Sequence, residues 1–192
     1  MKLKKSFYLT EDVVALAKSL LGKYIYTNID NKGITSGIIT ETEAYAGVID
    51  KASHAFGNRR TTRTEIMYLE GGVAYVYLCY GIHSLFNIVT NKKDIPHAVL
   101  IRGIKPVDGI PIMLERCKKK SITDKSGIGP GNVTKLLGIH YSHTGLSLQG
   151  NDIWLEDKNI KIQEKNIIVG TRVGVDYAGE DAKLPYRFQI KL

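Results

Sequence analysis

The sequence has little cysteine, and its two cysteines do not indicate a disulfide framework or a metal site. Cys79 and Cys117 are the only ones among 192 residues, too few for a small disulfide-stapled scaffold. No Cys/His cluster has the spacing of a structural zinc or iron–sulfur site. Cys79 lies in an apolar run, so we expect a buried, reduced thiol. Neither a structural metal nor a disulfide scaffold is expected.

Long hydrophobic runs, linkers, low-complexity stretches and internal repeats are missing as well. The basic start, Met1–Ser6, is not followed by an apolar signal-type segment, and no run approaches the ~20 apolar residues of a membrane span. We expect a soluble intracellular protein, cytoplasmic and nucleoid-associated if bacterial. A chain of 192 residues can bury a substantial core, so one domain over residues 1–192 is predicted.

Negative charge is in short supply. The chain has 19 acidic and 27 basic residues, which gives a formal charge of +8 and a pI of about 9.3. Such a surplus favours a polyanionic partner, either nucleic acid or an anionic membrane surface. The basic surplus is evidence about what the protein associates with and does not predict its fold.

Hydrophobic patterning predicts both helices and strands, and the part of the chain after Gly71 is rich in strands. A helix is expected over Glu11–Leu21, capped by Thr10 and ended by Gly22. A second helix is expected over Val107–Lys120, and a third, short one near Pro130. The predicted strands are Tyr24–Ile29, Ile34–Thr42, Val73–Tyr80, Ser84–Thr90, Ala98–Arg102, Ile153–Glu156, Ile160–Gln163, Gly170–Asp176 and Arg187–Lys191.

An acidic strand end gives the first functional signal. Glu41 and Glu43 are two residues apart, so an extended chain turns both carboxylates, and then Tyr45, to one face. This arrangement suits a pocket with a general base beside an aromatic wall. On spacing alone an exposed sheet edge with solvated glutamates is the more common arrangement, so both interpretations stay open here.

An aromatic hairpin gives the second signal. Within Val73–Tyr80, alternation places Tyr75, Tyr77 and Cys79 on one face, and Gly81 interrupts the run before the return strand. Tyr80 then falls at the hairpin tip. Exposed aromatic side chains at such tips favour a partner contact over a core role.

Two further segments could bind phosphate groups. The polar loop Ala55–Thr64 carries Arg59, Arg60 and Arg63, and either solvent or a phosphate backbone would satisfy them. The glycine-rich stretch Gly127–Gly138 leads into the predicted helix at Pro130, where backbone N–H groups could hold a phosphate.

Taken in order, these motifs resemble the alkyladenine (3-methyladenine) DNA glycosylase family found in animals and many bacteria. The resemblance covers nearly the whole chain and rests on an ordered set of motifs. The set consists of Glu41-Thr-Glu-Ala-Tyr45, Ser53-His54, Tyr75-Val-Tyr77-Leu-Cys-Tyr80-Gly81, Ala98-Val-Leu-Ile-Arg102, Gly129-Pro-Gly131, Arg172-Val-Gly-Val175 and Pro185-Tyr-Arg-Phe188.

The resemblance implies a single mixed α+β domain, with helices flanking a curved antiparallel sheet and a protruding hairpin that inserts into DNA. It implies hydrolytic release of alkylated or deaminated purines, such as 3-methyladenine, ethenoadenine or hypoxanthine, from double-stranded DNA. It further implies a monomer with no metal or organic cofactor, no membrane and no obligatory protein partner. No lysine matches a Schiff-base nucleophile, so strand cleavage is not expected.

The resemblance also assigns roles to residues. Glu43 matches the catalytic acid, and Arg102 the arginine beside that acid and the DNA backbone. The base-pocket residues match Tyr45, His54, Tyr77 and Asn87, and the DNA wedge matches Tyr80. Glu41 remains a structural neighbour.

The chemistry agrees with those roles. Extruding a base from the stack costs a few kcal/mol, and Tyr80 is placed to fill the gap as a minor-groove wedge. A cationic alkylated purine between Tyr45 and Tyr77 would gain roughly 0.5–2 kcal/mol from the rings, with His54 hydrogen-bonding its edge. Ionised Glu43 would accept a proton from the attacking water.

Two other functions are considered. Gly127–Gly131 with Asp152 downstream resembles a helix-hairpin-helix glycosylase, which would require a largely helical chain. A non-catalytic module that binds damaged DNA or RNA could use the same basic surface and the Tyr80 tip. Glu43 argues against the binder, because a carboxylate beside a polyanion gives a pure binding protein no advantage.

Overall fold

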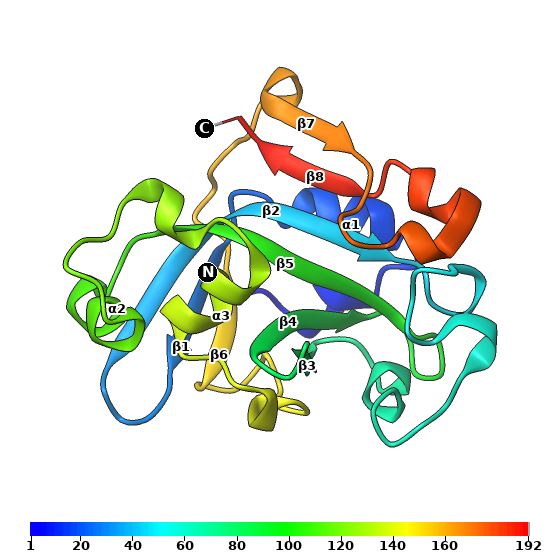
Figure 1. The fold of residues 1–192 in the computed structure, drawn as a ribbon, viewed down its shortest axis with the longest axis horizontal. Helices are drawn as coiled ribbons and strands as arrows, with labels where there is room; N and C mark the ends of the chain where they lie inside the picture. The colour runs from blue at the N-terminus through cyan, green and yellow to red at the C-terminus, as the bar shows by residue number, and fades with distance from the viewer. Residues whose placement is uncertain (192) are drawn as a thin grey trace.

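One antiparallel sheet organises the structure, a computed structural model that describes residues 1–191 (Figure 1). The main path of the sheet runs β3-β4-β5-β2-β1-β6, and β8 pairs with both β2 and β7. The strands are β1 (Tyr24–Asn28), β2 (Ile34–Tyr45), β3 (Val73–Cys79), β4 (His83–Thr90), β5 (His97–Pro106), β6 (Ile153–Glu156), β7 (Ile167–Gly170) and β8 (Arg187–Ile190). The predicted α+β class is confirmed: a curled antiparallel sheet flanked by helices, with the β3–β4 hairpin projecting from it.

Strand β2 lies in the middle of this arrangement. Its first half pairs with β1 and its later residues pair with β8, while β5 runs along its other side. Glu41 and Glu43 therefore lie between two hydrogen-bonded strands, and only 4% and 0% of their surfaces are exposed. The interpretation of this segment as an exposed sheet edge is wrong.

The main core lies on the face of β2 opposite the two glutamates. Three α-helices among the described residues cover it: α1 (Val13–Ser19), α2 (Ile110–Cys117) and α3 (Pro130–Leu137). Their buried side chains pack with the sheet in one cluster that includes Leu16, Ala17, Leu20, Met113, Val133, Leu136, Leu137, Ala44, Val99 and Ile101. Each large apolar side chain buried there contributes about 1.5–3 kcal/mol.

Both long predicted helices begin later than expected. Asp12, rather than Thr10, caps α1, because its carboxylate accepts hydrogen bonds from the N–H groups of Val14 and Ala15. Helix α2 begins only at Ile110, because backbone hydrogen bonds tie Val107 and Asp108 to Ser36. Gly109 then turns the chain at a φ of +74°, where a Cβ would lie 2.4 Å from the Ile34 carbonyl oxygen.

Two predicted strands are wrong. Ile160–Gln163 pairs with no strand among the described residues. The alternation there has another cause, since Ile160 and Ile162 pack against Gly22, in the turn that follows α1. Gly170–Asp176 is mostly loop, with only Gly170 at the end of β7. This loop crosses over β2, where the backbone N–H of Val173 meets Glu43.

The helices are short, which bears on two of the sequence-based interpretations. The α-helices among residues 1–191 have seven, eight and eight residues. None of the described helices is both long and apolar enough to cross a bilayer. The sheet-based architecture also excludes the helix-hairpin-helix alternative, which required a largely helical chain.

Candidate active site

A row of residues across four strands forms the floor of the site. Tyr75 of β3 lies opposite Asn87 of β4, Asn87 lies opposite Leu100 of β5, and Leu100 lies opposite Glu43 of β2. Because side chains alternate along a strand, residues two positions away share this face. They are Tyr77, Leu85, Arg102 and Tyr45. Strand register therefore collects residues that are up to 59 positions apart in the chain.

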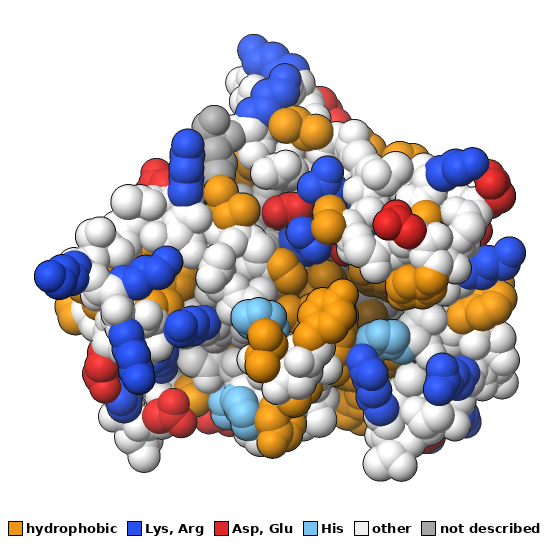
Figure 2. Space-filling model, in the orientation of Figure 1, with side chains coloured by type: hydrophobic (Ala, Val, Ile, Leu, Met, Phe, Trp, Pro, Cys, Tyr) orange, Lys and Arg blue, Asp and Glu red, His pale blue; other side chains and the backbone are white. Residues whose placement is uncertain are grey.

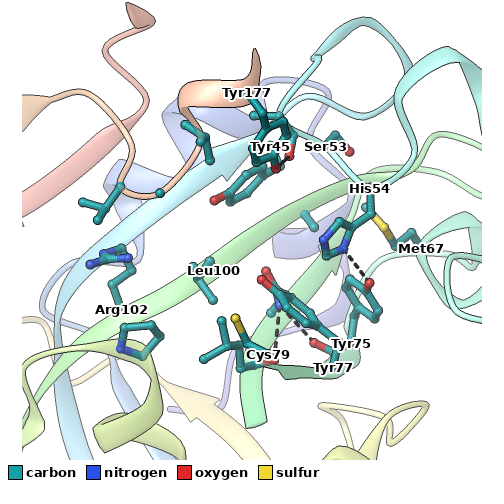
Figure 3. A pocket seen from close by; sticks show the side chains of 18 of the residues that line it. Tyr45, Ser53, His54, Met67, Tyr75, Tyr77, Cys79, Leu100, Arg102 and Tyr177 are labelled. Atoms are coloured by element: carbon teal, nitrogen blue, oxygen red, sulfur yellow. Dashed lines mark hydrogen bonds between the residues drawn. The ribbon is translucent and has the colours of Figure 1, made fainter. Parts of the chain in front are cut away.

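Above this floor lies a cavity of about 280 Å³, close to the lower end of the roughly 300–1,000 Å³ typical of small-molecule sites. Figure 2 shows this side of the molecule hollowed at its centre, with apolar side chains in the hollow and lysines and arginines around it. In Figure 3, Tyr45 and Tyr177 face Tyr77 and Cys79 across the cavity. The gap between two aromatic walls suits a flat, ring-shaped ligand.

Glu43 lies fully buried behind the lining of the cavity. Its Oε1 accepts a 2.8 Å hydrogen bond from the Val173 backbone N–H and lies 3.4 Å from Arg102 Nε. Its Oε2 accepts a 2.8 Å hydrogen bond from the Tyr45 hydroxyl. The carboxylate is thus oriented through both oxygens beside the aromatic wall.

Burial and partners act in opposite directions on this carboxyl. Burial raises the pKa of Glu43, while the Arg102 charge, the Val173 N–H and the Tyr45 hydroxyl lower it, and Glu41 raises it slightly. Burial prevails, so the pKa stays above its ordinary value. Once ionised, Glu43 is a stronger proton acceptor than a solvated glutamate.

Arg102 connects the two glutamates. Its Nε donates to Glu41 Oε1 at 3.0 Å, and the same oxygen accepts from Arg187 Nη1 at 3.2 Å. The β2–β5 register shifts at Glu41, which leaves Arg102 unpaired in a bulge and aims its side chain toward the carboxylates. Gly103 is required there, since a Cβ would lie 2.9 Å from Thr40 Oγ1.

His54 forms one end of the cavity. Its Nδ1 lies 2.8 Å from the Tyr75 hydroxyl, and its ring meets Tyr77 edge-on at 4.7 Å between centroids (Figure 3). Burial lowers the pKa of His54 to about 4, with smaller effects of the same sign from Arg63 and Arg59. His54 is therefore neutral at pH 7.

A buried ion pair that no local sequence pattern indicated joins Arg172 and Asp50, whose side chains are 0% and 1% exposed. Arg172 also donates to the Ala44 carbonyl at 2.9 Å, and its guanidinium lies 4.9 Å from the Tyr45 ring centroid. Asp50 accepts from the N–H groups of Ala46 and Ala52 at 3.0 Å each. The pair fixes the loop that leads to His54.

The tip of the β3–β4 hairpin lies beside the cavity mouth. Tyr80 is 91% exposed and has a φ of +51°, followed by Gly81 at +72°. Ile82 is also exposed, so the tip presents two apolar side chains to solvent. The predicted tip position of Tyr80 is confirmed. Cys79 differs from the prediction, because it is only half-buried and faces the cavity.

The three arginines of the loop have different surroundings. Arg60 pairs with Asp94 at 2.6 Å and lies 4.1 Å from the Tyr68 ring centroid. Arg59 and Arg63 form no ion pair within residues 1–191. Arg63 instead points toward His54, with 3.3 Å between Nη2 and Nε2. The structure thus gathers most of the predicted site residues at the cavity: Glu43, Tyr45, His54, Tyr77, Tyr80, Asn87 and Arg102.

Known proteins resemble this chain along nearly its whole length. The sequence model of the family described as methylpurine-DNA glycosylase (MPG) matches residues 6–192. The chain is 45% identical over 195 residues to a protein of Chlamydia felis, covering 99% of this chain and 96% of that one. Relatives from Bdellovibrio bacteriovorus and Clostridium perfringens are 44% and 40% identical, each covering 100% of this chain and 96% of the relative. All three carry the name "Putative 3-methyladenine DNA glycosylase".

Proposed function

Because the chain belongs to the methylpurine-DNA glycosylase family, we propose that it releases damaged purines from duplex DNA, with Glu43 activating the attacking water. The observation that carries the proposal is a fully buried carboxylate at the edge of an aromatic cavity. Its two oxygens meet the Tyr45 hydroxyl, the Val173 N–H and Arg102. Such an environment favours proton transfer and stabilises developing positive charge on a sugar.

The reaction is a hydrolysis. The damaged nucleotide leaves the stack, and its base enters between Tyr45 and Tyr77. The bond between C1′ and the base nitrogen breaks, and its electron pair leaves with the base. Water oxygen bonds to C1′ and passes a proton to Glu43. A cationic alkylated base departs as a neutral molecule, so a second carboxylic acid is not needed.

The surroundings of the cavity favour water over an amine as the nucleophile. None of the described residues that line the cavity is a lysine. The amino group of Met1 donates to the Asp157 carbonyl at 2.7 Å, so it is engaged outside the cavity lining. We therefore propose a monofunctional glycosylase that leaves an abasic site and does not cut the strand.

Asn87 is proposed to discriminate among purines. It is 4% exposed, and its Nδ2 donates to the Tyr75 carbonyl at 3.2 Å, which fixes the amide on the cavity floor. A fixed amide can reject a purine whose exocyclic group clashes with it or leaves it without a partner. Guanine, with its 2-amino group, is the base we expect it to exclude.

DNA engagement is assigned to the hairpin tip and the arginine loop. Tyr80 is proposed to fill the space that the extruded nucleotide leaves. Arg59 is proposed to contact a phosphate, and Arg60 can do so by releasing Asp94, because exposed pairs of this kind are weak. The cationic rim in Figure 2 agrees with a polyanionic substrate.

The test uses three DNAs: a duplex with hypoxanthine, a duplex with ethenoadenine, and alkylated genomic DNA. Mass spectrometry of the released base and alkali-labile sites report glycosylase activity, and a gel-shift assay reports lesion binding. We expect wild-type protein to release bases and Glu43→Gln to bind lesions without releasing them. If wild type binds lesions and releases none of the bases, the protein is a non-catalytic damage-binding module.

A further inference from the structure

Arg63 contacts the base-recognition residues from outside the cavity. Its guanidinium carbon lies 4.7 Å from the Tyr77 ring centroid, and its Nη2 lies 3.3 Å from His54 Nε2. His54 in turn reaches Tyr75 through Nδ1 at 2.8 Å. One arginine therefore joins a chain of three rings that form the cavity wall.

A second, outer cavity shows on which side the arginine lies. Tyr75 and Tyr77 line both cavities, whereas Arg63 lines only the outer one. A base stacked on the inner face of Tyr77 would thus have the guanidinium behind the same ring.

The positive charge of Arg63 is not neutralised nearby. The other arginines described at this site, Arg102, Arg172 and Arg187, each pair with a buried carboxylate. In the described part of the chain, no carboxylate lies within ion-pair distance of Arg63. Its charge therefore acts on the rings and on any ligand stacked against them.

The contacts also fix the state of His54. A guanidinium only donates hydrogen bonds, so His54 Nε2 must accept and its ring proton must lie on Nδ1, directed at the Tyr75 hydroxyl. Both ring nitrogens are thereby occupied. A second positive charge on His54 is disfavoured, in keeping with its lowered pKa.

We propose that Arg63 is a specificity-determining residue: its cation, held against Tyr77 and His54, weakens the attraction of the cavity for positively charged bases and lets neutral damaged purines compete. The inference rests on the proposed function. A ring attracts cations through the negative potential of its faces. A guanidinium behind Tyr77 opposes a cation in front of it and leaves a neutral purine largely unaffected.

The test compares variants that separate charge from hydrogen bonding. Arg63→Gln keeps an N–H donor and loses the charge, while Arg63→Lys keeps the charge. Arg60→Gln is the matched control, since Arg60 lies on the same loop over a different ring, Tyr68. Single-turnover release is measured for 3-methyladenine and for hypoxanthine. Arg63→Gln should raise the 3-methyladenine-to-hypoxanthine rate ratio about threefold to tenfold, and the other two should keep the wild-type ratio.

A second measurement does not depend on activity. Nitrogen-15 NMR of His54 should show the proton on Nδ1 in wild type, and in Arg63→Gln the pKa of His54 should rise from about 4 while staying below 6.5. If wild type releases no base, the proposed function fails, and this measurement alone decides whether Arg63 controls His54. An unchanged His54 would overturn the inference.

The rival role for Arg63 is a phosphate contact. In that case Arg63→Gln would slow both substrates equally, weaken binding to undamaged DNA and reduce its salt dependence. An unchanged rate ratio with those effects would overturn the specificity role.

Discussion

The Tyr45 hydroxyl donates a 2.8 Å hydrogen bond to Glu43 Oε2, and the same tyrosine forms a wall of the cavity. The residue that would stack on a damaged base therefore also sets the basicity of the carboxylate. Burial and the neighbouring carboxylate raise the pKa of Tyr45 well above its ordinary value. Tyr45 thus remains a donor at any physiological pH.

This relationship predicts the effect of Tyr45→Phe. The hydroxyl lowers the pKa of Glu43, so removing it raises that pKa further. A general base must be ionised, so the acid limb of the rate profile should move to higher pH, with the loss largest near pH 6 and smallest near pH 9. Single-turnover release from alkylated DNA across this range measures it. Tyr177→Phe is the control, because that hydroxyl donates to the Ala52 carbonyl. Identical profiles for the two variants would contradict the prediction.

Asp50→Ala is expected to be strongly destabilising. It leaves the buried Arg172 guanidinium without its carboxylate and removes the acceptor for two loop N–H groups. Breaking a buried pair in this way costs about 3–5 kcal/mol. Urea unfolding gives the difference, with Glu180→Ala of the exposed Lys183–Glu180 pair as a control that should stay within about 0.5 kcal/mol. A loss below about 1 kcal/mol for Asp50→Ala would show that the pair does not support this loop.

Tyr80→Ala should separate DNA engagement from stability. The Tyr80 side chain is 91% exposed, so its removal should change the free energy of unfolding by no more than about 0.5 kcal/mol. Release from a lesion duplex should fall more than release from single-stranded DNA, because only the duplex leaves a gap to fill. Ile168→Ala on β7 is a control for an exposed apolar side chain elsewhere. Equal losses of release activity on duplex and single-stranded DNA would show that Tyr80 does not act as the wedge.

His54 should make the fold acid-sensitive. Its folded-state pKa of about 4 lies below the ordinary 6.5, so its contribution is complete above pH 6.5 and is lost as pH falls through 4. Between pH 7.5 and 4.5 this amounts to about 2–3 kcal/mol. Denaturant unfolding should show a smaller loss over that range in His54→Gln, which cannot titrate. Equal losses in the two proteins would contradict the buried, neutral imidazole.

Local patterns were enough to predict some of these features. Alternation and Gly81 indicated the β3–β4 hairpin and placed Tyr80 at its tip, because a hairpin is specified by neighbouring residues. The shared face of Glu43 and Tyr45 followed from strand periodicity. Arg102 was matched to the arginine beside the catalytic acid only through the ordered motifs of the family. Its position beside Glu43 depends on the pairing of β5 with β2, which local patterns do not specify.

Other features depend on distant contacts and could not be predicted. Arg172 and Asp50 are separated by 122 positions, and neither carries a local signal of pairing. The hydrogen bond from Val173 to Glu43 uses the backbone N–H of Val173, so the identity of the Val173 side chain could not predict it. The alternation in Ile160–Gln163 led to a wrong strand prediction, because packing against Gly22 produces the same hydrophobic pattern as a strand.

The most direct test of the account compares Glu43→Gln with Glu41→Gln. Both carboxylates contact Arg102 and both are buried, yet only Glu43 meets the Tyr45 hydroxyl and the Val173 N–H. Single-turnover release of 3-methyladenine is measured for both variants, with thermal unfolding to confirm that each is folded. We expect Glu43→Gln to lose roughly 10³-fold or more in rate and Glu41→Gln less than about tenfold. Equal rates for the two variants would contradict the assignment of Glu43 as the base that activates water.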